Sequence, residues 1–217
     1  MQAVTQTESL SEKAYSLVEE LIVTLVLPPG HVFSEGELSQ QINIGRTPLR
    51  EALQRLAAER LVKALPRKGM MVAEINITDQ LAMLETRRVL DQLVVSRAAR
   101  RATMEQCEQL KSIQHDMKIA ATGEDITSFM RLDRACDAVL EAASRNPYAA
   151  QALTSLHAHC RRFWYQYQHE GDILKSALLH TQMISSVVSR DETQAAEHAD
   201  EIINYLEQFT RAALDLV

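Results

Sequence analysis

Glycine, proline and aromatic residues are scarce in this sequence, which has six glycines and five prolines among 217 residues and 5% aromatic side chains. Folds rich in β-sheet need frequent turns, so this scarcity favours long helices. Hydrophobic residues amount to 46%, enough to form a buried core. The three cysteines are an odd number without Cys-x-x-Cys spacing, which argues against both a disulfide framework and a structural zinc site.

Long hydrophobic runs are also absent. The longest mainly apolar stretch, Leu21 to Pro29, is far shorter than the ~20 residues that cross a bilayer. Residues 1–9 are polar and have neither the basic start nor the apolar segment of a secretory signal. We therefore expect a cytoplasmic protein with no membrane partner.

Charge is distributed unevenly along the chain. The 23 Lys and Arg against 29 Asp and Glu give a net charge of −6. Residues 46–68 reverse this balance, because they contain seven positive and two negative side chains. Such a segment is either a solvated basic face or a surface that binds a polyanion.

Four prolines and four glycines precede residue 76, which indicates one domain over 1–75 and another over 76–217.

Short elements are predicted in the first domain. Ser34 and Glu37 have the spacing of a helix capping box, and Pro28-Pro29-Gly30 ends the helix before them. Hydrophobic periodicity and turn residues predict helices over about 10–24, 35–41 and 47–59, and a β-hairpin joining 61–65 to 70–73. This order of elements is that of a winged helix-turn-helix.

The second domain is predicted to be entirely helical. Its breaks carry cap and turn residues such as Thr103, Gly123 and Asn146-Pro147. Six helices are expected, over about 78–101, 103–121, 125–144, 147–169, 172–189 and 191–216. The predicted fold is thus mainly α, with an N-terminal winged helix-turn-helix and a C-terminal six-helix antiparallel bundle.

The start of the third helix carries the side chains that suit DNA reading. Arg46, Thr47 and Arg50 occupy its first turns, which in a recognition helix point at base edges in the major groove. Arginine pairs with guanine O6 and N7, and threonine contacts a phosphate or a thymine methyl. Lys68 and Gly69 lie at the hairpin tip, where a cation can approach the DNA backbone or minor groove.

These residues carry a specific resemblance. The segment from Gly45 to Leu56 contains Arg-Thr-Pro-Leu-Arg-Glu-Ala-Leu. Together with residues 27–30, 37–38, 61–62 and 67–69, this segment resembles the DNA-binding domain of the GntR family of bacterial transcription regulators. The helical remainder is similar to the effector domain of the FadR-like branch, in its shorter, VanR-like version. Gly36 and Gly45 depart from the family, which commonly has Arg and Ser there.

The resemblance implies partners and contacts. Arg46, Thr47, Arg50, Lys68 and Gly69 match the family's DNA contacts. The family also implies a homodimer on a palindromic operator in double-stranded DNA, since one winged domain buries only ~600 to 1,000 Å².

A divalent metal site is a further implication of the resemblance. The family holds the ion with an Asp, a His four residues later and two more His on the last two helices. Asp133 and His180 match this set, whereas Asp137 replaces a His and the last position falls near Ile202. His198, one turn earlier, is the candidate substitute. Such a set would suit Mn²⁺ or Mg²⁺. The alternatives are a metal-free polar pocket and purely structural roles.

Family effectors are commonly small carboxylates, which need fixed cations. The candidate effector-binding residues are Arg87 or Arg88, Arg161 or Arg162, and Tyr165. For each arginine the alternative is a solvent-facing or ion-paired side chain.

The sequence as a whole predicts a ligand-responsive transcription regulator, with repression as the expected mode, a small-molecule effector and a homodimer. An effector-blind DNA-binding protein is the second hypothesis. A metal-dependent enzyme using Asp133, Asp137 and His180 is the third, and the absence of a Gly-rich phosphate loop and of His-Glu-x-x-His argues against it.

Overall fold

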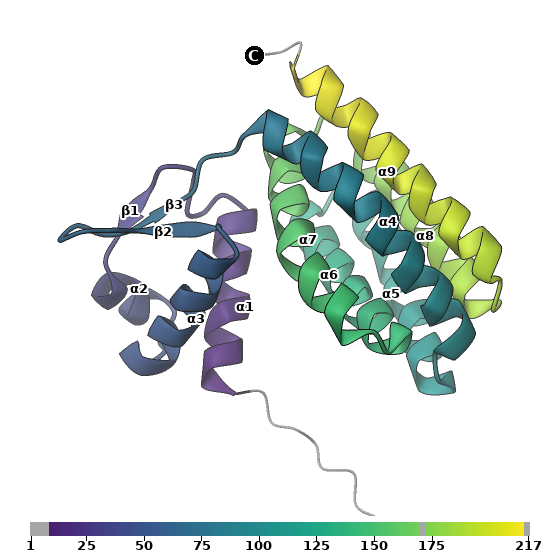
Figure 1. Cartoon of the computed structure of the whole chain (residues 1–217), viewed down its shortest axis with the longest axis horizontal. Helices are drawn as coiled ribbons and strands as arrows, with labels where there is room; N and C mark the ends of the chain where they lie inside the picture. The colour runs from purple at the N-terminus through teal and green to yellow at the C-terminus, as the bar shows by residue number, and fades with distance from the viewer. Residues whose placement is uncertain (1–8, 170–171, 215–217) are drawn as a thin grey trace, which may run out of the picture. The chain divides into compact units, whose positions relative to one another are not determined.

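The computed structural model describes residues 9–169 and 172–214 (Figure 1). The chain divides into two compact units between Ile75 and Asn76. Each unit is described separately below.

Three helices form the body of the first unit. They are α1 (Leu10–Val23), α2 (Glu35–Gln41) and α3 (Arg46–Ala58). The capping box predicted for α2 is present, since the Ser34 hydroxyl accepts from the Glu37 N–H and the Glu37 carboxylate accepts from the Ser34 N–H. Buried leucines on one face of α3 pack against α1 and α2, with Leu49 and Leu56 fully buried. The opposite face of α3 is therefore free to meet a partner.

A small antiparallel sheet completes the first unit. It consists of β1 (Val32–Phe33), β2 (Val62–Leu65) and β3 (Gly69–Val72), in the order β1-β3-β2. The hairpin of β2 and β3 was predicted, whereas β1 was not. Two residues are too short to show an alternating pattern, and β1 is a strand only because it pairs with β3, with Val32 opposite Met71.

Six helices make up the described part of the second unit, as predicted. They are α4 (Ile77–Arg101), α5 (Met104–Thr122), α6 (Ile126–Ser144), α7 (Pro147–Tyr167), α8 (Asp172–Val188) and α9 (Glu192–Leu214). Local signals set their starts: Thr103 and Gln106 form a capping box on α5, and Asn146 caps α7 ahead of Pro147. The sequence had located these helices to within two residues where the chain is described.

The bundle surrounds a partly polar interior. Helix α4 packs against α6, α7, α8 and α9, and Figure 1 shows α4 and α9 lying side by side along their length. Alongside apolar residues, the interior holds the charged side chains of Asp91, Asp133, His157 and Arg161. Across the described residues, every helix is too short or too polar to cross a lipid bilayer.

Candidate functional site

The first turn of α3 presents its polar side chains to solvent. Arg46, Thr47 and Arg50 are all exposed, while Leu49 between them is buried and anchors the helix. Gly45 precedes the helix and provides no side-chain cap, so the N–H groups at the start of α3 are open to an anion such as a phosphate. The three side chains lie where the sequence predicted them.

Another arginine of the basic segment has a structural role instead. Arg55 donates to Glu59 on its own helix and to Glu12 on α1, at N···O distances of 3.1 Å in both cases. Its guanidinium also lies 3.7 Å from the ring centroid of Tyr15. Arg55 thus links α3 to α1, and only part of the basic segment is available to DNA.

The wing, which is the hairpin of β2 and β3, carries the second group of predicted DNA contacts. Lys68 is exposed in the turn between β2 and β3, and its N–H donates to the Leu65 carbonyl. Gly69 follows with a φ of +98°, and a Cβ at this position would collide with the Phe33 carbonyl oxygen of β1. Glycine is therefore required for the hairpin to close on β1, and Lys68 is the last residue of the turn before Gly69.

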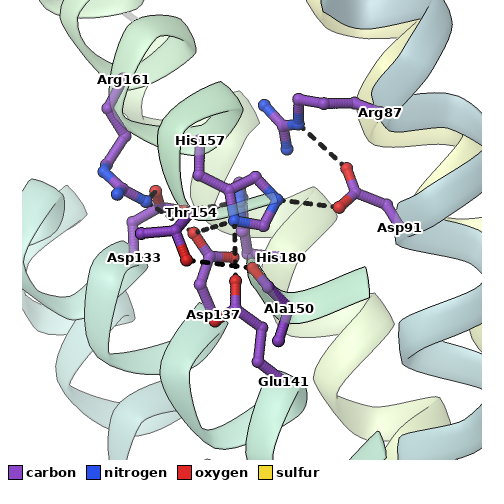
Figure 2. Close-up of polar contacts among 10 residues, drawn as sticks. All are labelled: Arg87, Asp91, Asp133, Asp137, Glu141, Ala150, Thr154, His157, Arg161 and His180. Atoms are coloured by element: carbon purple, nitrogen blue, oxygen red, sulfur yellow. Dashed lines mark hydrogen bonds and ion pairs between the residues drawn. The ribbon is translucent and has the colours of Figure 1, made fainter. Parts of the chain in front are cut away.

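Inside the second unit, seven side chains of alternating charge form a continuous chain, which we call the interior charge network (Figure 2). Its order is Arg87, Asp91, His157, Asp137, Arg161, Asp133 and His180. These residues come from four helices, with two on α4, two on α6, two on α7 and one on α8. The network therefore ties α4, α6, α7 and α8 together through buried ion pairs.

His157 lies at the centre of the network. Its Nε2 is 2.8 Å from an Asp91 oxygen and its Nδ1 is 3.0 Å from an Asp137 oxygen, with Glu141 3.5 Å from Nδ1. A neutral imidazole can donate from only one nitrogen, so two carboxylates this close to the ring favour the protonated form. Burial opposes this charge, but Asp137 and Asp91 outweigh burial and hold the pKa of His157 well above its usual value.

His180 has a similar environment at the other end. Its Nδ1 lies 2.8 Å from the carbonyl oxygen of Ser176, and its Nε2 lies 2.8 Å from Asp133. Both nitrogens face acceptors, so this ring is protonated as well. Burial acts against the charge, yet the hydrogen bond and the charge of Asp133 raise the pKa of His180. For Asp137, burial is outweighed by His157 and Arg161, which lower its pKa to about 2.

Two small cavities adjoin the network. Each has a volume of about 30 Å³, which is the space of about one water molecule. They share five lining residues, namely Arg87, Asp137, His157, His180 and Ile202. Any small molecule larger than water must therefore move side chains of the network in order to enter.

The predicted metal ligands do not fit a metal ion. Within residues 9–169 and 172–214, no group of three or more His, Cys, Asp or Glu side chains has an arrangement that could hold one. Asp133 and Asp137 are both ion-paired to Arg161, at 3.4 and 2.6 Å, so a guanidinium satisfies the carboxylates. The predicted substitute His198 instead bonds to the Ser186 hydroxyl at 2.8 Å and lines neither cavity.

The predicted effector ligands divide into two groups. Arg87 lines both cavities and Arg161 lines one of them. Arg88 pairs with Asp200 and Glu207 of α9, away from both cavities. Arg162 is buried and Tyr165 is half-buried, and neither lines these cavities. Burial of the α7 side chains depends on helix rotation within the bundle, which the sequence alone does not specify.

Asp91, Glu141 and His157 were not among the site residues predicted from the sequence. A signal for these residues existed. Arg87 and Asp91, Asp133 and Asp137, and His157 and Arg161 are three pairs with i, i+4 spacing, each on one helical face. Pairs of ionisable side chains with this spacing occur on three helices of the bundle. Their repetition predicts that the charged faces of these helices meet in the interior.

Comparison with known proteins agrees with both units. The model of the bacterial regulatory proteins of the gntR family matches residues 10–72, and the FCD domain model matches residues 82–205. The HTH-type transcriptional repressor RspR of Escherichia coli strain K12 is 26% identical over 214 residues, which cover 96% of this chain and 94% of that protein.

Solved structures share the fold. E. coli McbR/YncC aligns with a TM-score of 0.82 at 16% identity, covering 96% of this chain and all of that one. A putative GntR transcriptional regulator from Rhodococcus sp. RHA1 aligns with a TM-score of 0.68 at 17% identity, covering 95% of this chain and 98% of that one. The gntR family consists of bacterial regulatory proteins and RspR is a transcriptional repressor, which removes the enzyme hypothesis. The chain belongs to the GntR family of transcription regulators, with an N-terminal helix-turn-helix domain and a C-terminal FCD domain.

Proposed function

We propose that this chain is a cytoplasmic, ligand-responsive repressor that binds a palindromic operator as a homodimer and takes up a small organic acid in its FCD domain. The observation that supports it most directly is that the cationic start of α3 and the lysine of the hairpin turn are both exposed, in a chain whose net charge is −6. Repression is the mode named for the E. coli relative RspR.

DNA reading is assigned to five residues. Arg46 and Arg50 pair with guanine edges, Thr47 contacts a phosphate or a thymine methyl, and Lys68 with Gly69 meets the backbone or the minor groove. A single winged domain buries too little surface for tight binding, so two copies are needed. A homodimer increases affinity because the second domain binds at a high effective concentration.

Selection from random duplexes, followed by gel-shift titration, tests the DNA part. Arg46→Ala and Arg50→Ala should each lower the affinity for the selected duplex by about 1 to 3 kcal/mol. Lys13→Ala on the exposed face of α1 removes the same charge from the same unit and serves as the control. Unchanged affinity in both arginine variants would refute the assignment of α3 as the recognition helix.

The effector part is supported by the arginines that line the cavities. With both histidines protonated, four cationic groups stand against four carboxylates, so the interior is balanced before any ligand enters. The cations are Arg87, Arg161, His157 and His180, and the carboxylates are Asp91, Asp133, Asp137 and Glu141. An organic acid must therefore take the place of an internal carboxylate on Arg87 or Arg161. Such an exchange moves α4, α6 or α7, and a ligand that binds one arrangement better shifts the population.

A thermal-shift screen of mono- and dicarboxylic acids tests the effector part. An acid that raises the melting temperature of the wild type and changes its affinity for the selected duplex supports the proposal. The same acid should lose its effect on Arg87→Met or on Arg161→Met, whichever variant removes the arginine that holds the acid.

An effector-blind DNA-binding protein is the second candidate. The size of the two cavities beside the interior charge network favours it, since about 30 Å³ each leaves no preformed space for an organic acid next to Arg87 or Arg161. Failure of every acid in the screen, with selective DNA binding intact, would select this candidate.

A further inference from the structure

Glu35 is the first residue of α2 and reaches across to the DNA-facing side of α3. Its Oε2 accepts from Nε of Arg50 at 3.0 Å and from Nη2 at 2.7 Å. Among residues 9–169 and 172–214, neither side chain has another hydrogen bond or ion pair. The pair is exposed, with 60% of the Arg50 side chain accessible, so it adds little to the stability of the fold.

The geometry leaves the reading edge of Arg50 available. A guanidinium has five N–H donors, and Glu35 uses one on Nε and one on Nη2. Both donors on Nη1 and one on Nη2 remain, and the edge formed by one N–H of each nitrogen can pair with O6 and N7 of guanine. Glu35 thus holds the inner edge of Arg50 while the outer edge stays open.

We propose that Glu35 is a positioning residue for base reading, which orients Arg50 toward one guanine of the operator and so sets the preference at that base pair. The inference rests on the proposed role of α3 as the recognition helix. Glu35 carries a negative charge close to the DNA phosphates, so it weakens binding to every duplex alike. Its contribution is discrimination between sequences, at the expense of general affinity.

A matched pair of variants tests this role. Glu35→Gln removes the charge and the ion pair with little change of shape. Glu51→Gln removes the same charge from the residue next to Arg50, where the side chain is exposed and has no ion pair with any residue that the structure describes. Both variants are titrated with the duplex that the wild type selects from a random library, and with duplexes carrying single base-pair changes.

Glu35→Gln should bind unselected DNA at least as well as the wild type, yet lose about tenfold in discrimination at one guanine, which corresponds to about 1.4 kcal/mol. Glu51→Gln should keep the wild-type discrimination at every position. In the Arg50→Ala background, adding Glu35→Gln should cause no further loss at that guanine, because Glu35 acts through Arg50.

Two failures are distinguishable. If the wild type selects no sequence, the proposed DNA-reading function itself is wrong. If the wild type selects a sequence and Glu35→Gln discriminates equally well at every base pair, the positioning role alone is wrong. Circular-dichroism melting of each variant shows whether α2 remains folded, and Glu35→Asp, which keeps the negative charge at the helix start, should show the same loss of discrimination.

Discussion

The guanidinium of Arg161 on α7 lies 2.6 Å from the carboxylate of Asp137 on α6, inside the helical bundle. Only 7% of the arginine side chain and 20% of the aspartate side chain is exposed. The same guanidinium also reaches Asp133 at 3.4 Å. Two buried carboxylates therefore share this guanidinium in addition to their contacts with His157 and His180.

Arg161→Met should destabilise the protein by about 3 to 5 kcal/mol, since it leaves Asp133 and Asp137 without their shared cation in a buried site. Urea denaturation measures the change. Arg100→Met on the exposed end of α4 is the matched control and should have little effect. Adding Asp137→Asn to Arg161→Met should recover part of the lost stability. If Arg161→Met and Arg100→Met had equal stabilities, the ion pair between Arg161 and Asp137 would not have this stabilising role.

Stability should depend on pH through the interior charge network. The pKa values of His157 and His180 are raised, so their contribution is complete below the unfolded value of about 6.5 and is lost as the pH rises through the folded pKa values. The pKa of Asp137 is lowered to about 2, so its contribution is present above about pH 4 and is lost as the pH falls toward 2.

We therefore expect the highest melting temperature between about pH 4 and 6.5, with a decline on the alkaline side. His157→Gln should remove much of that alkaline decline, whereas His115→Gln on the exposed face of α5 should leave it intact. A wild-type melting temperature that stays constant from pH 6 to 10 would count against protonated histidines in the interior.

Metal removal should have no effect on the fold. Arg161 already neutralises the two carboxylates that were predicted as ligands, and a protonated His180 has no lone pair to offer. Dialysis against a chelator should leave the melting temperature unchanged, and added Mn²⁺ or Mg²⁺ should not raise it. A chelator-induced decrease that Mn²⁺ restores would show that the carboxylates can release Arg161 for a metal ion.

The wing lysine should contribute to affinity without affecting sequence preference. Lys68→Ala should weaken binding to all duplexes in about equal proportion and reduce the slope of log affinity against log salt by about 1. Lys13→Ala is the control, because it removes one exposed lysine on α1 and should leave the slope unchanged. Loss of affinity for only one sequence would instead assign Lys68 to base reading.

Gly69→Ala should destabilise the winged unit by more than about 1 kcal/mol, because its φ is +98° and the added Cβ would collide with the Phe33 carbonyl. Thermal melting and DNA titration check this together. Gly123→Ala is the control. Its φ is −87°, and the nearest atom to an added Cβ is the Ile119 carbonyl oxygen at 3.5 Å. Equal melting temperatures of the two variants would mean that the wing adapts to the methyl group.

Features set by neighbours along the chain were predictable. The capping box of Ser34 and Glu37 acts within one turn, and Pro147 opens α7 beside its cap Asn146. The start of α3 follows from the same local chemistry, which is why Arg46 and Arg50 were identified as exposed side chains of its first turns. The two-residue strand β1 was missed because it depends on a partner almost forty residues later.

The sequence by itself determined the helices, the winged domain and the i, i+4 spacing that places Asp133 and Asp137 on one face of α6. Only the tertiary structure decided what those carboxylates meet. The pairs His157–Asp91 and Arg161–Asp133 join residues 66 and 28 positions apart, and they depend on how each helix is rotated when the bundle packs. Helix formation is a local property of the chain, whereas the partner of a buried charge is chosen by packing, where leaving it unpaired is too costly.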